Sequence, residues 1–483
     1  NITHQQKSMD IDSLKAFRDR FDLQITNEEV EKLSFHKPAP DSPEIKYMME
    51  RREALGGFVP QRKRKGNSLK TPPLSAFENM LTATGEREIS TTMAFVRILS
   101  TLVRDKELGK YIVPIVPDEA RTFGMEGMFR QLGIYSSVGQ LYEPQDSDQV
   151  MFYKEQTDGQ ILEEGINEAG SFSSWVAAAT SYTVNGIQMI PFYIFYSMFG
   201  FQRIGDLAWA AGDSRARGFL LGATAGRTTL NGEGLQHEDG HSQLMAAMIP
   251  NCVSYDPTFS YELAVIMQDG LKRMIENQED VFYYITVMNE NYSHPEMPKG
   301  SEADIIKGMY SFSTSKIKGE KVQLMGSGVI LREVIEAQKI LESDYGVSAD
   351  VWSVTSFNEL RKDALEADRW NRMNPDKPQK ESHVVKLLKK AEGPIIASTD
   401  YMKSFAEQIA VFLPHKFVAL GTDGFGRSDS REKLRHFFEV DRHYVVVATL
   451  KALSDEGKIK SSVVTDAIKK FKLDPNKPNP VTQ

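Results

Sequence analysis

Between residues 71 and 297 the sequence alternates between helical patterns and short apolar runs that end in polar residues. The runs are YIVPIVP (111–117), MIPFYIFYSMFG (189–200), RGFLLGAT (217–224) and FYYITVMNENY (282–292). Continuous apolar runs of this length are typical of parallel strands that are buried on both faces. Polar side chains at the carboxyl ends of such strands are typical of a ligand site. The pattern therefore predicts an open, mostly parallel α/β sheet with helices on both faces and a site at its carboxyl edge.

A second α/β region follows in the sequence. KVQLMGSGVIL (321–331), a helical pattern and SADVWSVTS (348–356) have the order of a βαβ unit. PIIASTD (394–400), a further helical pattern and KFVALGTDGFGRSD (416–429) form a second unit of the same kind. The sequence thus predicts another α/β domain over residues 298–483, with a charged tail that is mostly surface helix.

Residues 1–70 are polar, and helical spacing is their only clear pattern. It covers MDIDSLKAFRDRF (9–21) and TNEEVEKLSF (26–35), where Thr26 is a suitable N-cap. The stretch that follows is rich in proline and basic residues, so we expect a linker that ends near KTPPLSAF. Three parts are expected: a helical and linker segment with a mobile loop (1–70), a first α/β domain (71–297) and a second one (298–483).

Composition excludes several functional classes. The 483 residues are 41% apolar and 26% charged, a balance typical of a soluble globular protein. The formal net charge of −8 disfavours general nucleic-acid binding, because phosphates would repel the chain. No apolar run approaches the roughly 20 residues that cross a membrane. The single cysteine, Cys252, cannot form a disulfide within the chain, which favours a reducing, cytoplasmic compartment.

Four polar, glycine-containing segments lie beside the apolar runs. They are PDEARTFGMEGMFRQLGIY (117–135), ILEEGINEAGSFSSW (161–175), PFYIFYSMFGFQRIGD (191–206) and TAGRTTLNGEGLQHEDGHS (224–242). Acidic, aromatic and histidine side chains at the ends of buried elements are what a cofactor pocket requires. The four segments are therefore the candidate site.

Taken singly, the acidic residues have ordinary structural interpretations. A glutamate such as Glu168, with Glu164 four residues before it, is more often part of a solvated helix face. Asp118 and Glu119, followed by Arg121, are typical of a helix N-terminus with an internal ion pair. Local pattern alone favours these interpretations.

The aromatic and histidine residues are equally ambiguous in isolation. Tyr196 and Phe199, in FYSMFGFQR, have the composition of a core strand end. His237 and His241 have the spacing of a zinc pair, but HEDGH is not HExxH and the flanking glycines disfavour one regular helix. His4 lies in a polar segment, as an exposed terminal histidine would. No metal site is expected among these residues.

In order and wording, the four segments resemble the pyrimidine-binding domain of the homodimeric, acetyl-transferring pyruvate dehydrogenases. GTDGFGRSDSREKLRHFFEVD (421–441) resembles the C-terminal domain that these enzymes share with transketolases. The resemblance implies a transketolase-like α/β fold, in which a pyrimidine-binding thiamin domain precedes a transketolase C-terminal-like domain. It also implies thiamin-diphosphate-dependent oxidative decarboxylation of pyruvate and reductive acetylation of the lipoyl group of dihydrolipoyl acetyltransferase, which yields acetyl-CoA in the complex.

The resemblance assigns five residues to the cofactor. Glu168, in GINEAG, would be the activating glutamate that contacts a ring nitrogen of the aminopyrimidine, beside the backbone near Ile166. Phe199 would stack on that ring, and Arg203 would supply hydrogen bonds. Asp118 would line the same pocket.

It assigns four further residues to catalysis, together with Glu168. Glu119 would lie close to the reacting substrate, and Tyr196 would donate a hydrogen bond in the pocket. His237 would exchange protons with thiamin-bound intermediates, as suits an imidazole. His4, on a mobile loop, would assist acetyl transfer to the lipoyl arm, and residues 137–154 would form a second mobile loop over the site.

The sequence lacks the GDG motif and the paired asparagines through which thiamin enzymes bind magnesium and diphosphate. The domain that binds Mg²⁺ is therefore expected before Asn1 or on another chain, and we expect the chain to begin within a longer polypeptide. The implied partners are a second copy in a homodimer, the lipoyl domain and core of dihydrolipoyl acetyltransferase, and pyruvate.

Two other interpretations remain open at this point. A transketolase-type thiamin enzyme has the same domain types and cofactor, although the basic and histidine residues that bind sugar phosphates are not evident. Alternatively, the chain by itself is a non-catalytic dimerisation and docking fragment, as the missing metal motif would allow.

Overall fold

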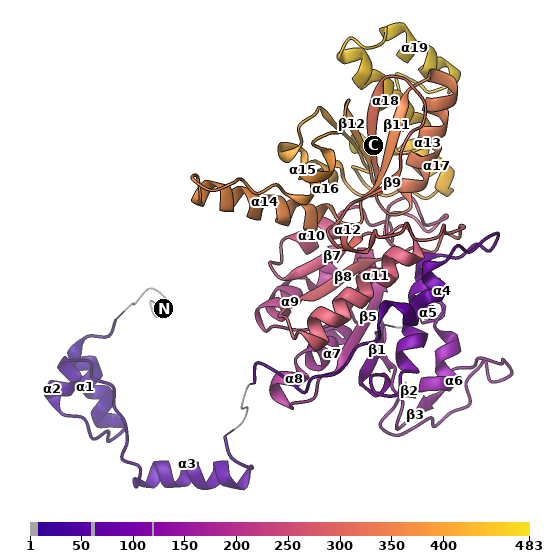
Figure 1. Cartoon of the computed structure of the whole chain (residues 1–483). Coiled ribbons are helices and arrows are strands. Elements are labelled where there is room, and N and C mark those ends of the chain that lie inside the picture. Colours follow the sequence, from indigo (N-terminus) through magenta and orange to yellow (C-terminus); the bar gives the residue numbers. More distant parts are fainter. Residues whose placement is uncertain (1–7, 59–62, 118–119) are drawn as a thin grey trace. The chain divides into compact units, whose positions relative to one another are not determined.

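The computed structural model describes residues 8–58, 63–117 and 120–483 (Figure 1). The chain divides into two units, residues 1–62 and residues 63–483. The first unit contains α1 (Ile11–Arg20), α2 (Asn27–Glu31) and α3 (Pro43–Ala54). Thr26 forms a capping box at the start of α2, which confirms the predicted N-cap. Helix α3 was not predicted, because its prolines and arginines resemble a linker, yet Pro43 stands at the helix start where proline is tolerated.

A sheet of six parallel strands forms the first half of the second unit. The strands are β1 (Ile112–Val116), β4 (Leu162–Glu163), β5 (Ile190–Tyr196), β6 (Phe219–Ala223), β7 (Cys252–Tyr255) and β8 (Phe282–Thr286). Their order is β4-β1-β5-β6-β8-β7, and every pair is parallel. The predicted parallel sheet is confirmed. The edge strands β4 and β7 were missed, because each is too short and too mixed in character to form a distinct apolar run.

Helices cover both faces of this sheet because its central strands are apolar on both sides. In β5, Phe192 and Ile194 join the core that also contains side chains of α5 (Thr91–Val103) and α11 (Ser260–Leu271). Tyr193 and Phe195 point to the opposite face and join side chains of α7 (Glu168–Ala179), α9 (Phe201–Asp213) and α10 (Ser242–Ala247). The alternation of strand side chains therefore divides one apolar run between two cores. Ser90 caps α5 by accepting the backbone N–H of Met93.

A second sheet follows, with strands β9 (Tyr310–Ser313), β10 (Lys321–Gly326), β11 (Ser348–Ser353), β12 (Ile395–Ser398) and β13 (Phe417–Leu420). Its order is β13-β12-β10-β11-β9, and β9 alone among these strands runs antiparallel, at one edge. The two predicted βαβ units are confirmed: α13 (Ile330–Tyr345) joins β10 to β11, and α16 (Lys403–Glu407) lies between β12 and β13. The boundaries at 70/71 and 297/298 stay predictions.

Further helices and a short strand pair complete the second unit. They are α4 (Glu78–Leu81), α6 (Phe129–Leu132), α8 (Ser181–Val184), α12 (Glu302–Ile306), α14 (Phe357–Met373), α15 (His383–Leu388), α17 (Arg431–Phe437), α18 (Arg442–Asp455), α19 (Ser461–Lys470) and the strand pair β2 (Ile134–Tyr135) and β3 (Glu155–Gln156). In the charged tail, helix is thus limited to α19 and a final turn, whereas surface helix was predicted for most of it. None of the helices in the described residues has the length and apolar character that a membrane crossing needs.

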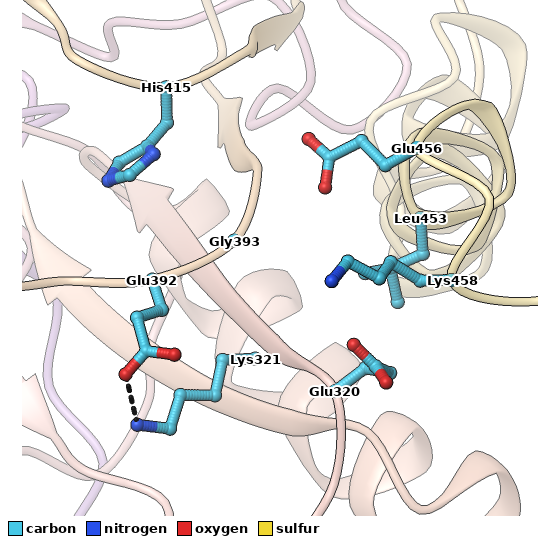
Figure 2. A pocket seen from close by; sticks show the side chains of 8 residues that line it. All are labelled: Glu320, Lys321, Glu392, Gly393, His415, Leu453, Glu456 and Lys458. Atoms are coloured by element: carbon cyan, nitrogen blue, oxygen red, sulfur yellow. Dashed lines mark hydrogen bonds and ion pairs between the residues drawn. The ribbon is translucent and has the colours of Figure 1, made fainter.

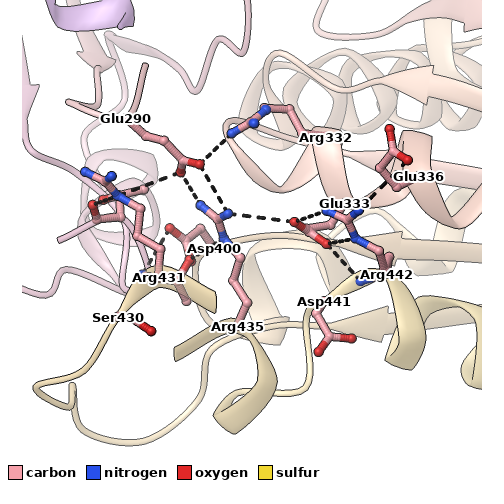
Figure 3. A network of polar contacts seen from close by, with 12 residues as sticks. Glu290, Arg332, Glu333, Glu336, Asp400, Ser430, Arg431, Arg435, Asp441 and Arg442 are labelled. Carbon is pink, nitrogen blue, oxygen red and sulfur yellow. Dashed lines mark hydrogen bonds and ion pairs between the residues drawn. The ribbon is translucent and has the colours of Figure 1, made fainter. Parts of the chain in front are cut away.

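A cluster of charged side chains connects the two sheets (Figure 3). Glu290, which follows β8, accepts hydrogen bonds from Arg435 on α17 and from Arg332 on α13, the latter at 2.6 Å. Burial alone would raise the pKa of Glu290, but the two guanidinium groups outweigh burial and lower it. The ion pairs therefore join the first sheet to two helices of the second domain while keeping Glu290 charged.

Two carboxyl groups at the same junction have the opposite tendency. Asp256 follows β7 and Asp400 follows β12, and both are completely buried. Burial raises the pKa of each to about 7, although Thr286 and Ser327 oppose the shift at Asp256, and Arg435 and Thr228 oppose it at Asp400. Near neutral pH these two carboxyl groups are therefore partly protonated.

The junction should make stability depend on pH. In the unfolded chain an aspartate titrates near about 3.9, so both groups bind protons more tightly when folded. Their stabilising effect is present at low pH and is lost as the pH rises towards about 7. We expect the unfolding temperature to fall by roughly 2 °C or more between about pH 5.5 and pH 8.

Thermal unfolding of Asp400→Asn should show a smaller decrease over this range than the parent. Asp455→Asn is the control, because Lys416 and Lys451 lower the pKa of Asp455 to about 2, outside the range. Equal pH dependence in the parent and in Asp400→Asn would contradict the prediction.

Candidate functional site

The predicted site residues approach one another at the carboxyl edge of the first sheet. Tyr196 ends β5, Phe199 lies in the 3₁₀ turn that follows, and Arg203 is in the first turn of α9. Glu168 begins α7, directly after β4 and its loop. His237 lies in the long connection between β6 and α10. Parallel strands place these connections on one edge, as the sequence pattern indicated.

Glu168 and Arg203 form the polar part of the site. Arg203 Nη1 donates to Glu168 Oε1 at 2.6 Å. The Glu168 side chain is 12% exposed, whereas that of Arg203 is 50% exposed. Asn167 caps α7 by accepting the N–H of Gly170, which fixes the start of the helix and hence the backbone of Glu168. The carboxylate is therefore shielded but lies next to solvent.

Aromatic rings form the apolar part of the site. The Arg203 guanidinium lies 4.3 Å from the Phe199 ring centroid, and the His237 ring is 5.2 Å from Phe199. The Tyr196 ring lies 4.9 Å from His237 and 6.0 Å from Phe199. Ring contacts thus connect four of the predicted residues into one continuous group.

Two residues without an assigned role also belong to this group. Phe123 packs edge-on against Tyr196 at 5.6 Å between centroids. Glu233 Oε2 lies 3.5 Å from His237 Nδ1. Both stand within the polar segments that the sequence singled out, but nothing in the spacing distinguished them from neighbouring residues.

The remaining predicted residues lie apart from this group or outside the described structure. The Ile166 side chain is exposed, two residues before Glu168, so only its backbone is available for the expected role. Asp118, Glu119 and His4 lie outside the described residues.

The histidine spacing does not produce a metal site in the described part of the chain. His237 lies beside Glu233, whereas the nearest acid to His241 is Asp239, at 3.9 Å. Asp239 itself accepts the backbone N–H groups of His241 and Ser242. Among the described residues, no group of three or more His, Cys, Asp or Glu side chains is arranged to hold a metal ion.

Residues 137–154 form a loop that connects the short strands β2 and β3, without helix or strand of its own. Asp146 is the main contact within it. Its carboxylate pairs with Arg121 and accepts the N–H of Tyr153 at 3.1 Å. Val138, Leu141 and Val150 are exposed, so few apolar contacts hold the loop in place.

A pocket at the amino ends of three strands of the second sheet contains none of the predicted site residues (Figure 2). It has a volume of about 230 Å³ and lies where β10, β12 and β13 begin. Lys321 and Glu392 pair across it at 2.9 Å, and the other charged groups of its lining are of both signs. The candidate site is therefore the carboxyl edge of the first sheet.

Two family models match the chain. Residues 74–295 match the pyruvate dehydrogenase E1 component middle domain, and residues 308–441 match the transketolase-like C-terminal domain. The pyruvate dehydrogenase E1 component of Pseudomonas aeruginosa is 65% identical over 483 residues, which are 100% of this chain and 55% of that protein. The same component of Escherichia coli K12 is 54% identical over 99% of this chain and 54% of its own length. The chain spans about half the length of the curated relatives it matches.

Solved transketolase structures share the fold. The Campylobacter jejuni enzyme has a TM-score of 0.57 at 16% identity and covers 78% of this chain and 49% of its own. The Leishmania mexicana enzyme has a TM-score of 0.56 at 15% identity and covers 84% of this chain and 51% of its own. Identity this low shows the fold alone, and it confirms the predicted transketolase-like α/β architecture.

Asp146 should control how easily the loop 137–154 opens. In Asp146→Ala the loop loses its ion pair with Arg121 and the acceptor for Tyr153, worth about 1 kcal/mol. We expect proteolytic cleavage within the loop to accelerate by roughly 5-fold or more, measured by mass spectrometry. Asp148→Ala, an exposed aspartate of the same loop, is the control. Equal cleavage rates in the two variants would show that Asp146 does not hold the loop.

Proposed function

Because the chain belongs to the family of pyruvate dehydrogenase E1 components, we propose that it provides the pyrimidine-binding side of a thiamin-diphosphate site. The activity of the whole protein would be oxidative decarboxylation of pyruvate with reductive acetylation of a lipoyl group. The observation that carries the proposal is the grouping of Glu168, Arg203, Phe199 and His237 at the carboxyl edge of the sheet. These residues come from three separate segments of the chain, and the sequence of each segment resembles that of the family.

The side chains suit an aminopyrimidine ring. Glu168 Oε1 is held by Arg203, and within the described structure Oε2 has no hydrogen-bond donor, so it is free to contact a ring nitrogen. Phe199 is half-buried and offers an aromatic surface beside it. When bound, thiamin diphosphate supplies the electron sink that decarboxylation of a 2-oxo acid needs.

The chain's own residues would orient the cofactor and move protons. Arg203 binds one oxygen of the Glu168 carboxylate, and the second oxygen would contact the cofactor. His237 is held against two aromatic rings and lies near Glu233, a setting in which an imidazole can accept or donate a proton. Glu119 and Asp118 are proposed to complete the pocket, on the family resemblance alone.

Magnesium and the diphosphate group would be bound elsewhere. The chain contains neither GDG nor paired asparagines, and its described residues contain no cluster of metal ligands. We infer that a further domain or chain provides these ligands. A homodimer and dihydrolipoyl acetyltransferase are the proposed partners, with His4 assisting transfer to the lipoyl arm on the family resemblance alone, and the cytoplasm is the proposed compartment.

The lack of the GDG motif and of paired asparagines favours a second candidate for the isolated chain, a dimerisation and docking fragment without catalytic activity. Calorimetric titration with thiamin diphosphate and Mg²⁺ separates the two. The chain would be compared with a fusion to the unmatched part of the Pseudomonas aeruginosa relative. Tight binding by the fusion and not by the chain supports our proposal, whereas no binding by either overturns it.

Glu168→Gln should abolish most activity of the fusion while leaving the fold intact. The amide is nearly isosteric, but it cannot share a proton with the cofactor ring, so turnover should fall by at least ~10²-fold. Stability should change little, because the paired Arg203 is half-exposed. Glu164→Gln, four residues earlier, is the matched control. Activity within a few-fold of the parent would exclude the role of Glu168.

His4→Ala should separate the two half-reactions. Transfer to a lipoyl arm needs a proton donor at the entrance to the site, whereas decarboxylation depends on the residues within it. We expect decarboxylation with an artificial electron acceptor to survive and acetylation of a lipoyl domain to fall by roughly 10²-fold. An equal loss in both assays, made on one preparation, would assign His4 to folding or to cofactor binding.

A further inference from the structure

We propose that Glu238 is a positioning residue for His237, and that it acts by holding the His237 loop against residues 424–431 of the second α/β domain. The inference rests on the proposed role of His237. The domain that carries the second sheet would then contribute to the active site of the first, although none of its side chains belongs to the group described above.

The loop between β6 and α10 has a buried base and an exposed tip. Residues 224–230 and 238–240 are buried, whereas residues 231–237 are exposed or partly exposed. His237 is the last residue of the tip, and Glu238 is the first residue of the buried part. The position of His237 therefore depends on how firmly the buried part that follows it is held.

Glu238 makes a hydrogen bond that crosses between the two domains. Its side chain is fully buried, and Oε2 accepts the backbone N–H of Arg427 at 2.6 Å. Burial raises the pKa of Glu238 to about 7, and the Arg427 N–H opposes the shift. Burying a carboxyl group with a single hydrogen-bond donor costs free energy that a surface position would avoid. The burial of Glu238 next to His237 therefore points to a specific role.

Arg227 holds the other side of the same segment. It is 4% exposed, donates to the backbone carbonyl of Gly424, and interacts electrostatically with Asp239, Asp400, Glu238 and Asp423. Its guanidinium lies flat against Gly240, where a Cβ atom would be 2.3 Å from Nη2. The Gly240 carbonyl in turn accepts the N–H of Met402 at 2.8 Å. Of the three residues after His237, Glu238 and Gly240 are thus held by direct contacts with the second domain, and Asp239 interacts with Arg227.

The exposed tip is attached to the same partner segment. Gly232 N–H donates to the Asp429 carbonyl at 3.1 Å, and Ser428 Oγ donates to the Gly232 carbonyl at 2.8 Å. Arg431 N–H donates to Asn231 Oδ1 at 3.1 Å. Residues 424–431 therefore contact the loop on both sides of His237 in the sequence.

Gly426 offers a way to disturb this contact from the other domain. A Cβ atom at Gly426 would lie 2.6 Å from Glu238 Oε2 and 2.9 Å from the Leu235 Cα atom. Both are too close for a real contact, and they flank His237. Gly426 has an ordinary backbone conformation outside the left-handed region, so alanine there adds only this steric pressure.

The test measures the position of His237 directly. In the chain labelled with ¹³C-histidine, the ring resonances of His237 are assigned by their loss in His237→Asn. The rings of Tyr196 and Phe199, at 4.9 and 5.2 Å, should shift these resonances away from their random-coil position. We expect Glu238→Ala and Gly426→Ala each to reduce that shift by about half or more. Glu238→Gln, whose amide oxygen still accepts the Arg427 N–H, should leave it unchanged.

Asp269→Asn controls for a general loss of stability. Asp269 is a partly buried carboxyl group whose pKa is also raised by burial, but it accepts a hydrogen bond from Tyr283 on the α11 side of the sheet. The Asp269→Asn variant should leave the His237 resonances unchanged. In the catalytic fusion, Glu238→Ala should lower kcat by roughly 10-fold with KM for pyruvate within about 2-fold, and Glu238→Gln should restore kcat.

Unchanged His237 resonances in folded Glu238→Ala, or equal shifts in Asp269→Asn, would overturn the proposal. If Glu238→Ala does not fold, Gly426→Ala carries the same comparison. If the His237 resonances move as expected but the fusion with His237→Gln remains active, the positioning contact is upheld. The proposed function of His237 is then refuted. The two ideas can therefore fail separately.

Discussion

The parallel arrangement of six strands is the constraint on which the rest of the structure depends. Parallel strands place all their carboxyl ends at one edge, so the connections that follow β4, β5 and β6 must meet there. Those connections carry Glu168, Phe199, Arg203 and His237. The strands themselves are apolar on both faces and are covered by helices on both sides, which leaves this edge as the place where polar groups can gather.

The second domain completes this edge by supplying charge. Glu290 and the arginines of α13 and α17 form a buried cluster in which each ion has at least one opposite partner. At Asp256 and Asp400 the effect of complete burial outweighs the opposing contacts, so these carboxyl groups are partly protonated near neutral pH. The junction therefore combines a fixed ionic contact with groups that titrate in the physiological range. The same domain also contacts the loop of His237.

The central elements of the fold could be predicted from the sequence because the patterns that indicate them are local. The runs that became β1, β5, β6 and β8 are long and apolar, and helix α5 has both periodicity and a cap at Ser90. The edge strands β4, β7 and β9 lacked such a signal, because each is only two to four residues long and is no distinct apolar run. Helix α3 was mistaken for linker, since proline and arginine fit a linker and a helix start equally well.

The sequence by itself predicted the family and the architecture, which the comparisons confirm, because a resemblance over four segments is specific. It also named the candidate site residues, whose roles stay predictions. It did not determine which of those residues touch. The Glu168–Arg203 pair joins positions 35 residues apart, and the contact of Glu238 with Arg427 joins positions 189 residues apart. The first contact depends on how the connections of one sheet meet, and the second depends on how the two sheets pack; local spacing carries no information about either. The tertiary structure alone therefore decided that the second domain holds the loop on which His237 lies.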